Sequence, residues 1–529
     1  MKKNLLLLLV IFVIAAAIRL IALDIRPVGF TWDEAALGYN AYSLLKTGRD
    51  EHQKIVPLVF ESFGDYKPGL YIYLTVPSVA ALGLNEFATR LPSAVLGALS
   101  VILVWFLIKE LFGMRQAVFG SIILALNPWS IYFSRGAWEA NIMVFLLLLG
   151  TVLALRKKMV LAAVFWGLTL WTYQGAKLIT PLLVLGYWGV FGETKLKNYW
   201  KPALILGLFA LPILWNIKAQ SGRLEVANVF SYVRPPETVA RVMQQDKSHV
   251  GSQVYYLFHS EKLDQIRGVT QRYLNHYSPR FLFIEGNWKS LRESIAYYGY
   301  FHIPEILLLV LGLVFLFKNW HGGSKFMVWW LLTAAVPAAL SRDLVSGVRS
   351  LPMTIPLVVI IGLGLSQLFK YKVLVTVYAL VMVFFFGLFI DLYFKQAPNY
   401  GADERLAMYK PAIELVNMHA NQYEHIIFTN KFGQPYIFVL FYNQIDPRLF
   451  WQTVVRIPTH GVDVGEVSSF DKWSFEKFYW PDTRSKKSTM VVGDELELPE
   501  VDLHFEALYR LGWVYYPNGV PALDVIGLK

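Results

Sequence analysis

Long apolar runs recur throughout the first three quarters of this 529-residue chain. Inside a bilayer every backbone N–H and C=O must find its partner within the protein, so lipid-facing segments of this kind have to be helices. The pattern therefore predicts a polytopic α-helical membrane protein with about eleven transmembrane helices, a number uncertain by one or two because several runs are short. The runs fall at 4–23, 91–110, 116–133, 142–155, 159–173, 178–192, 202–217, 303–318, 325–341, 351–369 and 373–394.

Composition supports this class of protein. The mean hydropathy is +0.43 and charged residues make up 16% of the chain, against roughly a quarter in a typical globular domain. The 17 Trp and 29 Tyr are side chains that favour membrane interfaces. The net charge of +11 lies largely in short connectors between apolar runs, where it sets orientation, so it does not indicate a nucleic-acid partner.

Alternate connectors are basic, which predicts their side of the membrane. We expect the opening run to be an uncleaved first helix of a multi-pass protein in the cell membrane, with its N-terminus in the cytoplasm. The outer side then receives loops at 24–90, 134–141, 218–302 and 342–350, together with the C-terminal tail. The basic connectors contain Lys109 and Arg115; Arg156, Lys157 and Lys158; Lys195, Lys197 and Lys201; Lys318 and Lys325; and Lys370 and Lys372.

The chain divides into two predicted domains. Residues 1–394 form the transmembrane domain, whose first outer loop includes an apolar stretch at 69–83 that is too short to span and is expected to lie at the interface. Residues 395–529 have shorter apolar runs and more charge, and they predict an extracytoplasmic α/β domain. Within this tail "YEHIIFTN", "PYIFVLFYN" and "KSTMVVGDEL" are typical of strands or strand–helix pieces.

Adjacent carboxylates, Asp33 and Glu34, follow the first apolar run in "TWDEAALGYNAY". A structural explanation accounts for Glu34, because Thr31 and Glu34 have the spacing of a capping box. The helix is then expected to end at Gly48, with an apolar face that includes Leu37 laid on the membrane. Asp33 is less well explained by capping, and both carboxylates are candidate catalytic residues.

Three further clusters of polar residues lie in the predicted outer loops. Two of them have an ordinary alternative, a snorkelling lysine in the first and a helical ion pair four residues apart in the second. The third, a pair of arginines, runs against the positive-inside trend, which suggests an anion there. Charge near the outer face of a bilayer is often functional, and cations there are suited to a phosphate. The clusters contain Asp65, Tyr66 and Lys67; Arg135 and Glu139; and Arg342 and Arg349.

At these residues the chain resembles the GT-C glycosyltransferases of the protein O-mannosyltransferase and lipid A aminoarabinose transferase type (glycosyltransferase family 39-like). The likeness covers roughly residues 1–370. It rests on Asp33-Glu34 after the first run, on "YKPGLYIYL" and on "NEFATRLPSAVLGALS". The stretches "LNHYSPRFLF" and "IPEILLLVLGL" add to it. One departure is that Gly69 follows Lys67-Pro68 where the family usually has a second proline.

The resemblance implies a sugar donor linked to polyprenyl phosphate and an outer-face acceptor, which can be a glycan, a lipid or a protein. It implies that Asp33 is the catalytic base and that Lys67 contacts the donor phosphate; from this we expect a single displacement with inversion. Glu139 is placed near a second acid of the family and Arg349 near a basic residue. Arg135 and Arg342 are further candidate phosphate contacts, predicted from their positions in the outer loops and not from the resemblance. Some members carry a divalent metal, which leaves a metal cofactor open, although no ligand cluster is apparent here.

Two alternatives remain open from the sequence. One is an oligosaccharide ligase or polymerase of the same superfamily, which transfers a chain of sugars. The other is a lipid or solute transporter, whose ionisable residues would run through the spans. The predicted charged clusters crowd one face instead, which favours the transferase.

Overall fold

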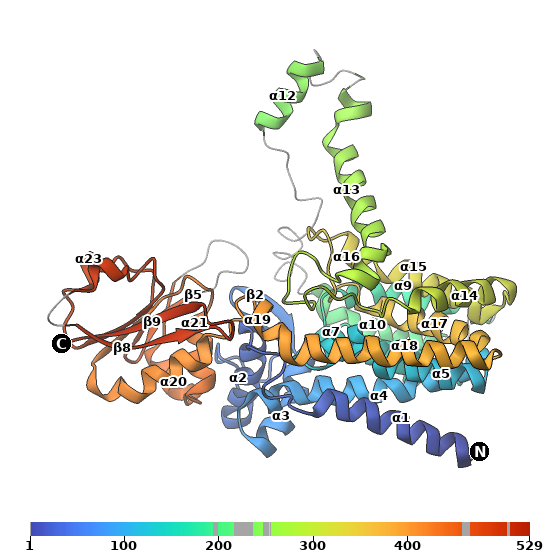
Figure 1. Ribbon diagram of the computed structural model, residues 1–529, viewed down its shortest axis with the longest axis horizontal. Coiled ribbons are helices and arrows are strands. Elements are labelled where there is room, and N and C mark those ends of the chain that lie inside the picture. The colour runs from blue at the N-terminus through green and yellow to red at the C-terminus, as the bar shows by residue number, and fades with distance from the viewer. Residues whose placement is uncertain are drawn as a thin grey trace.

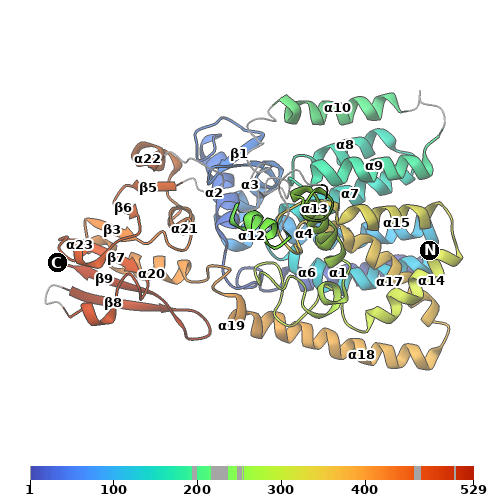
Figure 2. The ribbon, with the colours of Figure 1, turned by 90° about the horizontal axis from the view of Figure 1, so that it is seen from above.

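The computed structural model describes residues 2–193, 199–215, 236–246, 253, 255–457, 466–504 and 508–529. Long helices run roughly alongside one another, and a sheet stands beyond one end of them, as both views show (Figures 1 and 2). The N-terminus lies at the far end of the helices from the sheet (Figure 1). Parts of the predicted loop 218–302 and the end of the predicted span 202–217 fall outside the described residues.

Every apolar run predicted to span forms helix in the part that the structure describes. The helices are α1 (Lys2–Leu20), α4 (Glu86–Phe112), α5 (Met114–Leu126), α6 (Pro128–Ser134), α7 (Glu139–Leu155), α8 (Met159–Thr169), α9 (Ala176–Phe191), α10 (Trp200–Trp215), α14 (Glu305–Lys318), α15 (Gly322–Ala334), α16 (Val336–Ala339), α17 (Thr354–Leu368) and α18 (Lys372–Asp391). Within the described ranges, four helical segments are individually long and apolar enough to cross a membrane. Counting the pair α5–α6, bent by 55°, as one span gives five. The total of about eleven spans stays a prediction.

Helix α18 lies at the margin of the bundle (Figure 2), whereas nearly all residues of α17 are buried inside it. Of the apolar segment Leu351–Leu368, which contains α17, 94% is buried. In the segment Lys372–Gly401, which begins with α18, only 6% of the most apolar stretch is buried. Glycines permit the close packing of α14 on α17: a Cβ at Gly312 would lie 1.8 Å from the Ile360 carbonyl oxygen, and one at Gly364 would lie 1.9 Å from that of Leu308. Small residues of this kind let membrane helices approach backbone to backbone.

The first predicted outer loop forms α2 (Trp32–Thr47), the hairpin β1 (Val59–Ser62) and β2 (Asp65–Pro68), and α3 (Leu70–Leu82). These elements lie between the bundle and the sheet (Figure 1). Helix α2 ends before Gly48, at φ 71°, as predicted. The prediction that the apolar face of α2 lies on the membrane is wrong, because Leu37 and Ala41 are buried in a cluster that also contains the C-terminal residues Phe438 and Phe441. The apolar face of α2 therefore supports protein packing.

The C-terminal part contains a seven-stranded mixed sheet in the order β4-β5-β6-β3-β7-β9-β8. Strand β3 pairs in parallel with both β6 and β7. The predicted strands in "YEHIIFTN" and "KSTMVVGDEL" are β3 and β7, whereas "PYIFVLFYN" forms helix α21. The strands are β3 (His425–Phe428), β4 (Val455–Ile457), β5 (Glu466–Phe470), β6 (Trp473–Phe475), β7 (Thr489–Gly493), β8 (Leu508–Tyr515) and β9 (Pro521–Leu528), and the helices are α20 (Tyr409–His419), α21 (Pro435–Tyr442), α22 (Pro447–Thr453) and α23 (Trp480–Thr483).

Helices α12 (Pro236–Asp246) and α13 (Glu261–Asn275) project away from the bundle, across the direction of its long helices (Figure 1). Short helical turns complete the chain between the larger elements. They are η3 (Tyr255–His259), η4 (Arg280–Ile284), η5 (Leu351–Met353), η6 (Leu392–Gln396), α19 (Ala397–Gly401), η7 (Ala420–Gln422) and η8 (Glu500–Asp502).

Candidate active site

The start of α2 is fixed by a capping box. The Thr31 side chain accepts the Glu34 N–H at 3.4 Å, and the Thr31 N–H donates to Glu34 Oε2 at 3.2 Å. These bonds satisfy N–H groups that the first turn leaves without partners. Asp33 is thereby held in the first turn of α2.

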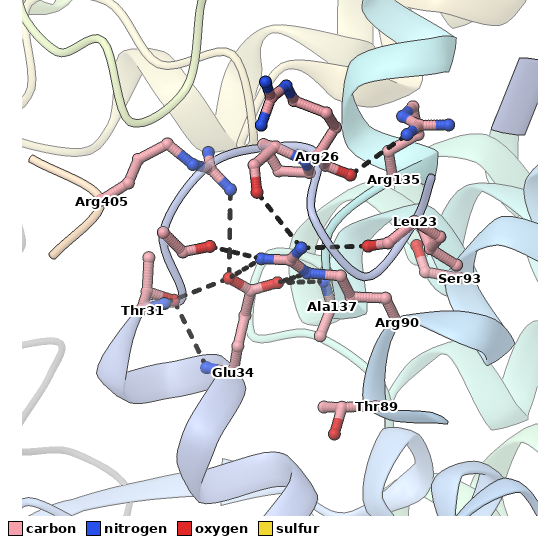
Figure 3. A network of polar contacts seen from close by, with 12 residues as sticks. Leu23, Arg26, Thr31, Glu34, Thr89, Arg90, Ser93, Arg135, Ala137 and Arg405 are labelled. Carbon is pink, nitrogen blue, oxygen red and sulfur yellow. Dashed lines mark hydrogen bonds and ion pairs between the residues drawn. The ribbon is translucent and has the colours of Figure 1, made fainter. Parts of the chain in front are cut away.

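Glu34 lies in a buried charge network of its own (Figure 3). Arg90 Nε donates to Glu34 Oε1 at 2.9 Å, the Ala137 N–H donates to the same oxygen at 3.0 Å, and Arg405 Nη2 lies 3.9 Å from Oε2. Burial favours the protonated form of Glu34, but these partners outweigh it and lower its pKa. The geometry argues against the catalytic role predicted for Glu34, because its carboxylate is enclosed by structural partners.

Lys67 lies on strand β2 of the β1–β2 hairpin. Its two turn residues, Phe63 and Gly64, have φ of 56° and 73°, values expected of a tight hairpin turn. Lys67 pairs across the strands with buried Phe60. The glycine after Pro68 is explained here, since a Cβ at Gly69 would meet the Phe60 ring at 2.5 Å. A proline at this position would also lose the bond from the Gly69 N–H to the Leu58 carbonyl, 3.0 Å long.

Asp33 bridges two cations. Lys67 Nζ donates to Asp33 Oδ1, and Arg292 Nη2 donates to Oδ2. The Asp33 side chain is 30% exposed, so it remains accessible from solvent. Burial raises its pKa, but Lys67 and Arg292 more than reverse this effect and hold the pKa well below the usual range. Asp33 is therefore an ionised carboxylate in a cationic clamp.

Arg292 is further held by aromatic rings. Its guanidinium carbon lies 5.2 Å from the centre of the Trp32 ring and 5.9 Å from that of Trp138. Such contacts orient a guanidinium without neutralising it.

Two cavities meet at Asp33, and Lys67 and Arg292 line both. The first, which we call the bundle cavity, has a volume of about 550 Å³ and is walled by Trp138 and by residues of the 285–294 and 342–350 segments. Its ionisable lining is balanced between acids and bases. The acids are Asp33, Glu139, Glu293 and Asp343, and the bases are Lys67, Lys289, Arg292 and Arg349.

The second, which we call the sheet cavity, has a volume of about 690 Å³. It lies between the first turn of α2, with Trp32 and Asp33, and the residues that follow strands β3 and β6 of the C-terminal sheet. Both volumes are in the range of small-molecule sites. Asp33 thus borders both cavities.

The predicted site residues divide into two groups. Asp33, Lys67, Glu139 and Arg349 all line the bundle cavity, and Arg349 pairs there with Asp343. The other predicted residues do not line either cavity; they are Glu34, Asp65, Tyr66, Arg135 and Arg342. Arg342 is exposed beside Asp343, Asp65 is buried within β2, and the Tyr66 carbonyl accepts a hydrogen bond from Gln174.

Arg135 is the clearest correction among the predicted phosphate contacts. Its side chain is fully buried, and Nη1 and Nη2 donate to the carbonyls of Ile18, Ile21, Ala22 and Arg26 at 2.6–3.2 Å. These carbonyls lie at and just beyond the C-terminal end of α1, where backbone acceptors lack helical partners. Arg135 therefore ties α6 to the end of α1 and is withdrawn from the cavity.

Arg292 was not predicted from the sequence. It lies in "EGNWKSLRES" (285–294), near the end of the predicted outer loop 218–302, where two basic residues, Lys289 and Arg292, precede a late span. These outer-side cations are the local signal that could have indicated it. The adjacent Glu293 accepts the Gly347 N–H at 2.7 Å and that of Val348 at 3.3 Å. Glu293 therefore fixes the segment that carries Arg349 in its place beside the cavity.

His276 supports the same segment. Its Nε2 accepts the Ser346 N–H at 3.0 Å, so its proton is on Nδ1, 2.6 Å from the Arg272 carbonyl oxygen. Burial lowers the pKa of His276 to about 4. A neutral histidine with both nitrogens bonded to backbone is structural.

A divalent metal does not fit the residues around Asp33. Over the described ranges, no group of three or more His, Asp or Glu side chains converges in a way that could hold a metal ion. The two groups that engage Asp33 are cations, which repel a metal ion. No step of the chemistry is therefore assigned to a metal.

Comparison with known proteins gives a family match over part of the chain and a similar fold over nearly all of it. Residues 67–216 match the profile of the family described as dolichyl-phosphate-mannose-protein mannosyltransferase. The structure of ArnT from Cupriavidus metallidurans in the apo state aligns with a TM-score of 0.55 at 13% identity, over 98% of this chain and 97% of that one. The same protein bound to undecaprenyl phosphate aligns with a TM-score of 0.54, also at 13% identity and with the same coverage.

The Archaeoglobus fulgidus oligosaccharyltransferase in complex with zinc and sulfate aligns with a TM-score of 0.50 at 12% identity, over 98% of this chain and 72% of that one. At these identities the likeness concerns the fold alone. No curated protein matches the sequence significantly. The family match and the fold confirm the resemblance inferred from the sequence.

Proposed function

We infer that this chain, a membrane glycosyltransferase of the GT-C superfamily, transfers a sugar from a polyprenyl-phosphate donor to an acceptor hydroxyl group. The observation that carries the proposal is the position of Asp33, at the junction of two cavities and between two cations that can bind a phosphate. One cavity would receive the donor and the other the acceptor. ArnT, whose fold is similar, binds undecaprenyl phosphate, which supports the choice of donor.

The donor phosphate is assigned to the bundle cavity, next to Lys67, Arg292 and Arg349. Each of these cations faces a carboxylate in this structure. An arriving phosphate competes for them, and its charge-assisted bonds to guanidinium groups are strong. When Lys67 and Arg292 turn to the phosphate, Asp33 loses the partners that lower its pKa and becomes a better base. Donor binding would thus activate Asp33.

Transfer is proposed as a single displacement with inversion. Asp33 accepts the proton of the acceptor hydroxyl while that oxygen bonds to the anomeric carbon from the sheet-cavity side. The bond from this carbon to the phosphate oxygen breaks, and its electron pair leaves with the polyprenyl phosphate. The cations stabilise the charge that develops on the leaving group.

The proposed setting is the cell membrane, with the N-terminus in the cytoplasm and with the active site and residues 395–529 outside. The basic connectors support this orientation. The sheet and the N-terminus at opposite ends of the bundle agree with it (Figure 1). A lipid-linked donor suits this side, where cytoplasmic nucleotide sugars are not available.

The direct test uses the purified full-length chain in detergent with synthetic undecaprenyl-phosphate sugars and an extract of the cell envelope. We expect release of undecaprenyl phosphate and labelling of an acceptor, both lost in Asp33→Asn and kept in the control Asp24→Asn, which lies outside both cavities. Near wild-type transfer by Asp33→Asn would remove Asp33 from the mechanism. Transfer from an added undecaprenyl-linked oligosaccharide, without transfer from the single-sugar donors, would indicate the ligase instead.

A further inference from the structure

The sheet cavity lies at an edge of the C-terminal sheet that suits ligand binding. Strands β3, β6 and β7 are parallel, so their carboxyl ends meet at one edge. The residues that follow β3 and β6 there, Asn430, Lys431, Glu476 and Lys477, all line the sheet cavity. In α/β sheets, ligands characteristically bind just outside the carboxyl ends of parallel strands.

Two features anchor this edge beside Asp33. Gly433, in the turn after β3, has φ of 117°, and a Cβ there would lie 3.0 Å from the Trp32 ring. Trp32 directly precedes Asp33, and the Arg292 guanidinium packs over the Trp32 ring. The turn after β3 is thus packed onto the residues that hold the proposed base.

The charge of the sheet cavity differs from that of the bundle cavity. Its ionisable lining has an excess of bases: Lys67, Arg292, Lys431 and Lys477 against Asp33 and Glu476. Glu476 is paired with Lys486 at 3.5 Å, and Lys431 with Asp494. Lys477 is exposed and has no acidic partner among the described residues. An excess of positive charge favours an anionic ligand.

Asn430 adds a polar contact. Its Oδ1 is buried and accepts no hydrogen bond within the described residues. A buried acceptor without a donor is costly. Because the Asn430 side chain as a whole is only partly buried, its amide can turn toward the cavity, where a sugar hydroxyl is a suitable donor.

We propose that this edge of the sheet is the acceptor site, and that the acceptor is a polyhydroxylated molecule bearing an anionic group such as a phosphate. Lys477 binds the anionic group, and the Asn430 amide accepts a hydrogen bond from a hydroxyl of the same molecule. The target hydroxyl then points toward Asp33. The assignment rests on the proposed transferase function and adds the chemical class of its acceptor.

The test uses maltotriose and its monophosphate as probes, with saturation-transfer NMR on the full-length chain in detergent. We expect the phosphorylated probe to bind about 5- to 10-fold more tightly, as one charge-assisted contact allows. Lys477→Glu should abolish this preference, and Asn430→Ala should weaken the binding of both probes. Lys487→Glu, before β7 at the opposite edge of the sheet, is the matched control and should keep the preference.

Arg349→Ala separates the two cavities, because Arg349 lines the bundle cavity alone. We expect it to leave the phosphate preference unchanged. Equal binding of both probes, loss of the preference in Arg349→Ala, or its survival in Lys477→Glu would each overturn the assignment. Binding of undecaprenyl phosphate to the same samples is a separate readout: its failure would count against the proposed donor and leave the result at Lys477 intact.

Discussion

The carboxylate of Asp33 accepts a hydrogen bond from Arg292, a residue 259 positions further along the chain. Lys67 occupies the other carboxylate oxygen. The proposed base is therefore held between two proposed phosphate ligands before any substrate arrives. This arrangement links donor binding to base strength, and it makes the site open to mutational and pH experiments.

The pH dependence of transfer should shift when the clamp is removed. A carboxylate base works only when ionised, so its rate falls as pH drops through its pKa. Because Lys67 and Arg292 hold the Asp33 pKa well below its ordinary value of about 3.9, the acid limb of kcat/KM should lie below about pH 4 in the wild type. In Lys67→Ala burial remains while one cation is lost, so the limb should move to higher pH. An unchanged profile would show that Asp33 is not the titrating base.

Arg292 should contribute mainly to donor recognition. Arg292→Ala is expected to raise the KM for undecaprenyl-phosphate sugars by about 10-fold or more, since a charge-assisted contact contributes roughly 1.5–3 kcal/mol. Arg292→Lys keeps the charge but loses the planar fork, so it should recover part of the loss. The kinetics of Lys67→Ala, of Arg292→Ala and of the variant with both substitutions provide a double-mutant cycle. Independent, additive effects would contradict a shared role at Asp33.

Glu34 should support stability instead of chemistry. Glu34→Gln leaves the fully buried Arg90 without its charged partner, and breaking a buried pair typically costs about 3–5 kcal/mol. We expect a lower unfolding temperature in detergent with donor turnover per folded molecule largely retained. Arg90→Gln combined with Glu34→Gln should destabilise less than the two single losses added together. Loss of turnover in a fully folded Glu34→Gln protein would restore a catalytic role for Glu34.

The glycine after Pro68 should be required by packing against Phe60. Gly69→Ala places a methyl group where the Phe60 ring lies, and overpacking of this kind usually costs about 1–3 kcal/mol. The hairpin that carries Lys67 should shift, which reduces both stability and donor affinity. Gly69→Ala with Phe60→Leu should recover both. Failure of the second substitution to rescue would show that backbone conformation, not the ring, requires the glycine.

Local patterns were sufficient for much of the fold. The apolar runs predicted the helices of the bundle, and Thr31 with Glu34 predicted the start of α2. Asp33 and Lys67 were both placed in the predicted outer loop 24–90, and the roles expected of them came from the resemblance to a known family. The run "PYIFVLFYN" could not be assigned in this way, because a short apolar stretch fits a buried helix as well as a buried strand.

Contacts between distant segments could not be derived from these patterns. Arg135 and Arg349 look alike as isolated cations, yet one is enclosed by the carbonyls near the end of α1 and the other lines the bundle cavity. Leu37 faces the C-terminal residues and not lipid, because the sheet domain covers α2.

By itself, the sequence determined the apolar helices and the capping box at Thr31, since each depends on residues a few positions apart. It also predicted Asp33 and Lys67 as site residues, through the resemblance to a known family. Only the tertiary structure decided that Arg292 completes the clamp on Asp33 and that the edge of the C-terminal sheet walls a second cavity. The physical reason is that charge pairing and cavity shape depend on distance in space, which helix packing and domain docking set for residues hundreds of positions apart.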